Sequence, residues 1–162
     1  MNETSFPGPG EAKFFEDYTQ GAVYELGSVI VYRDEVIAFA TRYDPQYFHI
    51  DEERAKESIY GGIIASGWHT ASMMMRVFAD GFLSDASSMG SPGLDELKWS
   101  RPVRPGDTLF VRAIVLETRL SKSKPDLGVV RTRSEVHNQG GEFVMSSTAV
   151  NFMRRRPTGR EE

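Results

Sequence analysis

Residues 66–80 form a segment that is apolar on nearly every side of a helix, and no other stretch constrains the fold as strongly. A helix of that kind is buried inside a protein rather than laid on its surface. Small residues near its start allow other backbone to approach closely. Its large apolar side chains are Trp68, Met73, Met74, Met75, Val77 and Phe78. The sequence therefore predicts a central buried helix over residues 66–80.

After a loop over residues 81–93, the spacing of apolar residues changes from the 3.6-residue period of a helix to the two-residue period of a strand. Residues 129–137 show this best, because Val130, Thr132, Ser134 and Val136 alternate with charged residues or histidine. That alternation predicts a strand with one buried face and one wet face. The expected strands cover residues 94–100, 108–120, 129–138 and 142–153, with a hairpin at Gln139-Gly140-Gly141.

These elements predict an α+β fold in which one antiparallel sheet wraps one buried helix. Such a sheet leaves edges and a face uncovered, and a second copy of the chain would cover them. A length of 162 residues suits one domain. We expect a loose N-terminal arm (1–17), the domain (18–156) and a C-terminal tail (157–162). An aromatic patch, interpreted as a lid or an interface contact, consists of Phe14, Phe15 and Tyr18.

The segment before the central helix combines short elements with a break at a proline. The break follows because Asp44 precedes Pro45, and a residue before proline is disfavoured in the α region. Gly27 separates two short apolar runs in the same way that a turn would. The expected elements are strands over 22–26 and 29–32, a helix from Asp34 to about Tyr43, a tight turn over 45–49, and a short helix over 52–56 capped by Asp51.

The composition argues against several kinds of site and location. The chain has no cysteine, which removes disulfides, thiolate catalysis and thiolate metal sites. A net charge of −4 gives no sign of nucleic-acid binding, and we interpret the three arginines at 154–156 as a solvated tail in preference to a phosphate- or partner-binding site. The N-terminus lacks signal-peptide features, and no apolar run approaches the ~20 residues of a membrane helix. We therefore expect a cytoplasmic protein that does not bind nucleic acid or membrane.

Asp44 and His49 are the first candidates for chemistry. Five residues apart on a helix they would point apart, but a turn at Pro45 would let both act on one water molecule. The imidazole can change charge near neutral pH, and burial can raise the pKa of the carboxylate. Such a pair can take a proton from water and return one to carbon. The alternative is a plain turn residue beside a structural histidine.

The start of the central helix, Ser66-Gly67, is the second candidate. A helix start has unpaired N–H groups and the positive end of the helix dipole, and glycine lets a ligand approach the backbone. A thioester carbonyl held there would be stabilised as it becomes an enolate, an effect typically worth ~3 kcal/mol per donor. The alternative is a glycine needed only for tight packing under the sheet.

The other polar residues carry weaker signals. We interpret His69 as a core or interface histidine and place His137 on the wet face of a strand. Three scattered histidines without cysteine make a poor metal set, so no metal is expected. The sequence shows neither a Gly-x-Gly-x-x-Gly segment nor a P-loop, and it lacks the Gly-x-Ser-x-Gly elbow of a hydrolase.

Three segments together resemble the MaoC-like family of hydratases and dehydratases, which includes the (R)-specific enoyl-CoA hydratases. They are Tyr43-Asp-Pro-Gln-Tyr-Phe-His-Ile-Asp51, Gly61-Gly-Ile-Ile-Ala-Ser-Gly-Trp-His69 and Arg101-Pro-Val-Arg-Pro-Gly-Asp107, and the resemblance covers roughly residues 18–153. Two departures stand out. The family often has histidine where this chain has Ser66, and many members have asparagine directly before the proline, where this chain has Asp44.

The resemblance implies a hot-dog fold and a homodimer or higher oligomer, with an acyl-CoA channel along the protomer interface. It implies that Asp44 and His49 carry the reaction and that the Gly67 N–H holds the thioester oxygen. The implied reaction is reversible addition of water to a 2-enoyl-CoA, giving a 3-hydroxyacyl-CoA. No cofactor is expected, because CoA is part of the substrate.

Further substrate contacts are expected outside this pair. Ser66 and Trp68 are predicted to touch the acyl thioester. The basic loop that holds Arg119, Lys122 and Lys124 is predicted to meet the CoA phosphates, the alternative being ordinary solvated loop charge. Three other functions stay open: a hot-dog acyl-CoA thioesterase, a non-catalytic acyl-CoA-binding or assembly module, and a monomeric lipid carrier.

Overall fold

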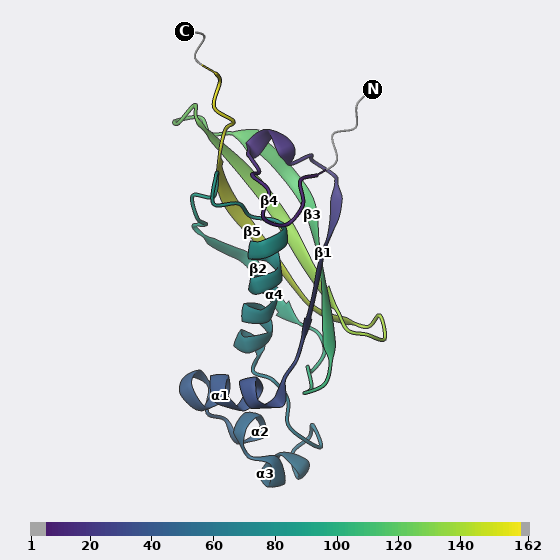
Figure 1. The fold of residues 1–162 in the computed structure, drawn as a ribbon. Coiled ribbons are helices and arrows are strands. Elements are labelled where there is room, and N and C mark those ends of the chain that lie inside the picture. Colours follow the sequence, from purple (N-terminus) through teal and green to yellow (C-terminus); the bar gives the residue numbers. More distant parts are fainter. Residues whose placement is uncertain (1–5, 160–162) are drawn as a thin grey trace.

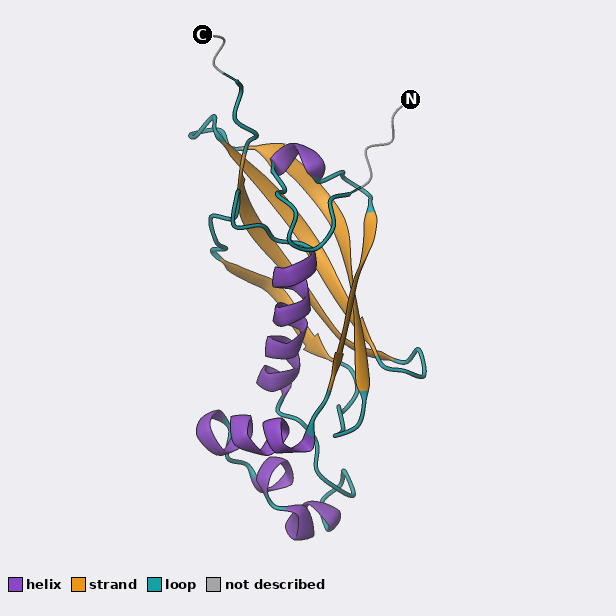
Figure 2. Cartoon of the chain, viewed as in Figure 1, coloured by secondary structure: helices purple, strands orange, loops and turns teal. Residues whose placement is uncertain are grey.

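Helix α4 (Gly67–Gly81) lies in the hollow of a curved antiparallel sheet (Figures 1 and 2). The structure is a computed structural model that describes residues 6–159, so the ends of the predicted arm and tail fall outside the described residues. The sheet order is β1-β3-β4-β5-β2. This is the predicted α+β architecture, a hot-dog fold. The strands are β1 (Val23–Ile30), β2 (Gly93–Trp99), β3 (Thr108–Leu120), β4 (Leu127–His137) and β5 (Phe143–Arg154).

The long strands follow the sequence periods closely. β3 spans the residues predicted for it, and β4 and β5 pair antiparallel around the predicted glycine hairpin. On β4 the side chains of Val130, Thr132, Ser134 and Val136 are buried, and those between them are half-buried. The predicted alternation of an inner and an outer face is therefore confirmed.

Helix α4 buries one face in the sheet and leaves another face exposed, so the prediction that it is buried on nearly every side is not met within one chain. Its buried side chains include Thr70, Met73, Met74, Val77 and Phe78. On another side of the helix, Trp68 is 59% exposed and Met75 is 43% exposed. The all-round apolar pattern thus combines a core face with an uncovered stripe. No helix within residues 6–159 is both long enough and apolar enough to cross a bilayer.

Three short helices form one end of the molecule (Figure 1): α1 (Arg33–Tyr43), α2 (Tyr47–Ile50) and α3 (Glu52–Lys56). α1 ends at the predicted residue, and the Asp51 carboxylate caps α3 by accepting from the Arg54 N–H at 3.1 Å. Two expectations differ in detail. The turn after Pro45 winds into α2, and β1 is one strand because Gly27, at φ +126°, forms a bulge inside it.

The opposite end of the sheet is closed by residues 6–17, which include the 3-10 helix η1 (Phe15–Asp17) (Figure 1). The Phe15 ring lies against Gly128 of β4, and the buried Tyr18 hydroxyl donates to the Phe82 carbonyl at 2.6 Å. The described part of the arm is therefore packed rather than loose. Tyr18 belongs to the core, and η1 lies at the opposite end of the sheet from α1–α3, so the predicted patch of Phe14, Phe15 and Tyr18 forms no lid over those helices of the same chain. The alternative, an interface contact, stays a prediction.

Candidate active site

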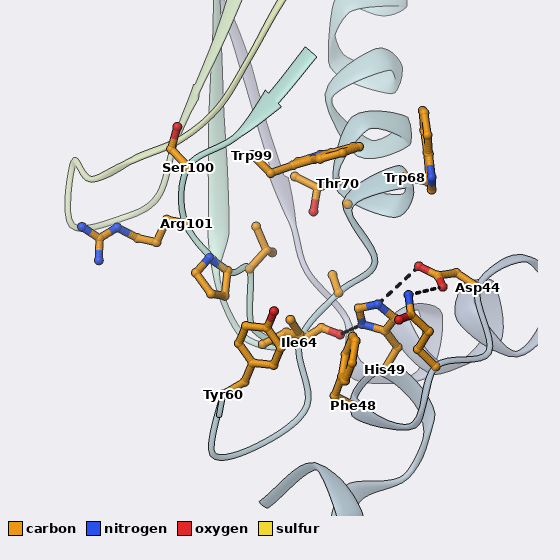
Figure 3. Close-up of a pocket in the computed structure, with 15 residues that line it drawn as sticks. Asp44, Phe48, His49, Tyr60, Ile64, Trp68, Thr70, Trp99, Ser100 and Arg101 are labelled. Atoms are coloured by element: carbon orange, nitrogen blue, oxygen red, sulfur yellow. Dashed lines mark hydrogen bonds and ion pairs between the residues drawn. The ribbon is translucent and has the colours of Figure 1, made fainter. Parts of the chain in front are cut away.

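The break after α1 brings Asp44 and His49 together. Asp44 ends α1 with extended φ and irregular ψ (−154°, 68°), and His49 lies on the single turn of α2. His49 Nε2 lies 3.3 Å from Asp44 Oδ2 (Figure 3). The break before Pro45 thus brings the two side chains into contact. On a continuous helix, residues five apart would point in different directions.

The hydrogen bond of His49 Nδ1 determines which nitrogen of the neutral ring carries the hydrogen. His49 Nδ1 lies 2.7 Å from the Ile64 carbonyl oxygen, and the ring is 4% exposed. A carbonyl only accepts, so Nδ1 carries the hydrogen of the neutral ring and Nε2 is left with a lone pair. Nε2 and the carboxylate are then two adjacent acceptors. Both can accept hydrogen bonds from one water molecule.

The Asp44 carboxylate is held from two sides. Ser66 Oγ donates to Oδ2 at 2.7 Å, and Gln46 Nε2 donates to Oδ1 at 2.7 Å. Partial burial alone would raise the pKa of the Asp44 carboxyl, but the hydrogen bonds from Ser66 and Gln46 outweigh it and lower the pKa below its usual value. Burial acts in the direction that the sequence suggested, but the net shift is downward, so the carboxylate is ionised at neutral pH.

Gly67 opens α4 beside this pair. Its N-cap, Ser66, makes no side-chain cap to the helix, because its hydroxyl is used on Asp44. The first N–H groups of α4 therefore keep their unpaired character and the positive end of the dipole. The Trp99 indole lies flat against the glycine: a Cβ added at Gly67 would come within 2.6 Å of it.

A cavity of about 470 Å³ joins these groups (Figure 3). Asp44, His49 and Gly67 line one part of it, next to the indoles of Trp68 and Trp99, which meet edge to face with centroids 5.3 Å apart. The other lining residues are Gln46, Phe48, Tyr60, Ile64, Ala65, Thr70, Ser100, Arg101, Pro102 and Val103. A cavity with a mostly apolar wall and a few converging polar groups is the usual form of a small-molecule site.

The family model for the MaoC-like domain matches residues 17–138, which is most of the chain. The chain belongs to the MaoC-like domain family. A MaoC-like dehydratase from Rhodospirillum rubrum is 41% identical, with a TM-score of 0.84 over 91% of this chain and 100% of that one. YdeM of Bacillus subtilis is 32% identical over 125 residues, 76% of this chain and 86% of its own length.

A more distant neighbour shows the same fold. The R-hydratase PhaJ1 from Pseudomonas aeruginosa has a TM-score of 0.70 at 24% identity, covering 92% of each chain. Membership in the MaoC-like family, together with the Rhodospirillum rubrum dehydratase, supports hydratase or dehydratase activity in general terms.

Several predicted site residues of this MaoC-like domain are brought together and others are not. Asp44, His49, Gly67 and Trp68 line the cavity. Ser66 is fully buried, and its hydroxyl contacts Asp44, so that group is not free for the predicted substrate contact.

The basic loop does not reach the site within one chain. Arg119, Lys122 and Lys124 line a different hollow, where β3 ends, at the opposite end of the sheet from α1–α3 (Figure 1). β3 has 13 residues, so at 3.3 Å per residue it carries the loop about 40 Å away. The predicted phosphate contact is therefore not formed beside Asp44 and His49 of the same chain.

The histidines outside the site follow the sequence interpretation. His69 is buried and stacks on Phe39 with centroids 4.7 Å apart, which confirms a core position. Burial lowers the pKa of His69, with Glu35 acting weakly in the other direction. His137 is half-buried and lies edge-on to Phe143.

Removing the hydroxyl in Ser66→Ala should raise the pKa of Asp44, because the carboxylate loses its strongest donor. The matched control is Ser72→Ala, which removes a serine hydroxyl of the same helix that donates to the Trp68 carbonyl and not to Asp44. Carboxyl ¹³C shifts followed by NMR against pH measure the change directly. An unchanged Asp44 titration in Ser66→Ala would contradict the assigned role of this hydroxyl.

The same variant should lose stability in a pH-dependent way. The folded-state pKa of Asp44 lies below its unfolded value, so its contribution to stability is present above the unfolded pKa and is lost as pH falls through the folded pKa. Ser66→Ala should lower the free energy of unfolding by about 1–3 kcal/mol at pH 7. The difference from the parent should shrink in acid, as urea denaturation at several pH values would show.

Proposed function

We propose that this protein catalyses the reversible addition of water to a 2-enoyl-CoA thioester, giving a 3-hydroxyacyl-CoA. The observation that carries the proposal is the pairing of two acceptors, Asp44 Oδ2 and His49 Nε2, 3.3 Å apart beside the start of α4. Family membership and the Rhodospirillum rubrum dehydratase support the reaction class.

The proposed reaction uses the pair to position and deprotonate water. Asp44 and His49 each accept a hydrogen bond from one water molecule. One proton of this water is removed as its oxygen forms the new bond to C3 of the substrate, and the other stays on that oxygen. The C2=C3 electron pair becomes the C1=C2 bond of an enolate, whose negative charge lies on the thioester oxygen. Asp44 and His49 then return the proton taken from water to C2, and the carbonyl is restored. All atoms of water end in the product, so no other reactant is needed.

The enolate oxygen needs a donor during this step. The Gly67 N–H, at the positive end of α4, is the proposed donor. The thioester acidifies C2 by itself, so the proposal invokes no metal or cofactor.

A homodimer is also part of the proposal. β2 is an edge strand that pairs only with β5 within residues 6–159. Beside that edge lie four exposed apolar side chains: Leu94, Trp99, Trp68 and Met75. An open edge next to apolar surface favours a partner strand. Sedimentation at micromolar concentration should give twice the 18.2 kDa chain mass, and a stable monomer would contradict the dimer.

The enoyl-thioester absorbance band tests the reaction. Crotonyl-CoA and a longer or branched 2-enoyl-CoA should lose the band on incubation, without release of free CoA thiol. Thiol release from a saturated acyl-CoA would instead indicate a thioesterase. Measurable binding without either change would indicate an acyl-CoA-binding module, and both of these results would overturn the proposal.

A further inference from the structure

Two hydroxyl groups point into the cavity from opposite walls, those of Tyr60 and Thr70 (Figure 3). They come from different parts of the fold. Tyr60 lies on the loop that leads into α4, and Thr70 lies one turn inside the helix. The proposed mechanism uses neither hydroxyl, because it needs only Asp44, His49 and the Gly67 N–H.

Tyr60 is held firmly while its hydroxyl stays available. Its ring packs edge to face against Phe48, with centroids 5.3 Å apart, and its backbone carbonyl accepts from Arg104 Nη2 at 2.5 Å. Its hydroxyl makes no hydrogen bond to any other residue among 6–159. The hydroxyl of this fixed ring therefore faces the cavity with its hydrogen-bonding capacity available to a ligand.

Thr70 offers the complementary surface. The residue is 2% exposed, and its Oγ1 donates to the Ser66 carbonyl at 3.3 Å, which is long for such a bond. Its oxygen lone pairs are therefore free on the cavity side. The lining of the cavity also includes the apolar side chains of Ile64 and Val103.

The charges of the cavity lining limit which chemical group of a ligand could bind between Tyr60 and Thr70. Arg101 is the one cationic side chain among the residues that line this cavity. Its guanidinium lies 2.8 Å from the Glu142 carboxylate and is turned away from the cavity in Figure 3. A carboxylate placed between Tyr60 and Thr70 would therefore have no free cation, and burying such a charge is costly.

We propose that the acyl group of the substrate carries an uncharged oxygen in addition to its thioester carbonyl. This oxygen, of a hydroxyl or a second carbonyl group, binds between Tyr60 and Thr70. This inference rests on the proposed function for the identity of the thioester. A plain alkyl chain would leave the Tyr60 hydroxyl and the lone pairs of Thr70 Oγ1 without partners from the ligand. A site built to bind a hydroxyl discriminates against the analogue that lacks it. Tyr60 is thus a specificity-determining residue and takes no part in the proton transfers.

Matched thioesters test the inference. Two pairs differ only by a terminal hydroxyl in place of a methyl group: 4-hydroxybut-2-enoyl-CoA against pent-2-enoyl-CoA, and 5-hydroxypent-2-enoyl-CoA against hex-2-enoyl-CoA. In the parent, at least one hydroxylated member should have a kcat/KM about tenfold above that of its alkyl partner, the factor that one good hydrogen bond provides. In Tyr60→Phe that preference should vanish, so that the two members of each pair have kcat/KM values within about twofold of each other.

A control and a binding measurement keep the outcomes separate. Tyr32→Phe removes a phenol that is 56% exposed and outside this cavity, and it should leave the preference intact. Calorimetry with saturated 5-hydroxypentanoyl-CoA and hexanoyl-CoA gives the same comparison without turnover. Selective binding that Tyr60→Phe abolishes would support this inference even if no enoyl-CoA were hydrated. Equal or better use of the alkyl compounds, unchanged in Tyr60→Phe, would overturn it while hydration itself stood.

Discussion

Asp44→Asn should lower kcat/KM for enoyl-CoA hydration by about a thousandfold, within the range that one acid–base group contributes. The amide has nearly the same shape, and it can still accept one of the hydrogen bonds from Ser66 and Gln46. It cannot take a proton from water at neutral pH. The loss should appear in kcat as well as in kcat/KM, because the interaction belongs to the transition state.

Asp34→Asn is the matched control for that change. Asp34 lies in the first turn of the same helix, α1, and is exposed. The substitution removes one negative charge from a helix start, at a cost of about 0.3–1 kcal/mol and with no effect on the reaction. If Asp44→Asn kept activity within a few-fold of Asp34→Asn, Asp44 would not be the base.

His49→Ala extends the argument to the pair. If the two side chains act on one water molecule, removing the second after the first should cost little more. The double variant should therefore retain nearly the activity of the weaker single variant. Fully multiplicative losses would mean that Asp44 and His49 work on different steps.

The fold was predictable because its main signals are local. The period-two alternation on β4 and the glycines of the following turn determine strand, face and hairpin without distant information. The pre-proline position of Asp44 likewise predicts where α1 must end. The exposed side of α4 was harder to predict from the sequence, since Trp68 and Met75 are as apolar as the buried side chains around them.

The site was predictable only where its residues are close in sequence. Asp44 and His49 share one turn, and Ser66 and Gly67 share one helix start. Trp99, by contrast, reaches Gly67 only through the pairing of β2 with β5, which no local pattern encodes. Tyr60 was missed because a lone tyrosine in a loop has no period. The contact predicted for the basic loop is not made within one chain, because the length of β3 carries the loop away from Asp44 and His49.

Gly67→Ala should lower kcat/KM by about a hundredfold, a loss comparable to removing one oxyanion donor. The backbone is helical there, so alanine is tolerated by the helix and even favoured. The substitution would cause a steric clash, because the new Cβ would come within 2.6–3.0 Å of three atoms of the Trp99 indole. The expected stability loss is about 1–2 kcal/mol, within the usual cost of adding a methyl group to a packed site.

Trp99→Ala separates the two explanations for this glycine. Placed in the Gly67→Ala background, it removes the indole that the methyl group would displace. If activity stays low in the double variant, the methyl group itself blocks the approach of the thioester oxygen to the N–H of residue 67. If activity returns to that of Trp99→Ala alone, the glycine serves only to let the indole pack, and the enolate must be stabilised elsewhere. Measuring kcat/KM together with urea denaturation for all four proteins distinguishes these outcomes, because a packing role lowers stability and activity together.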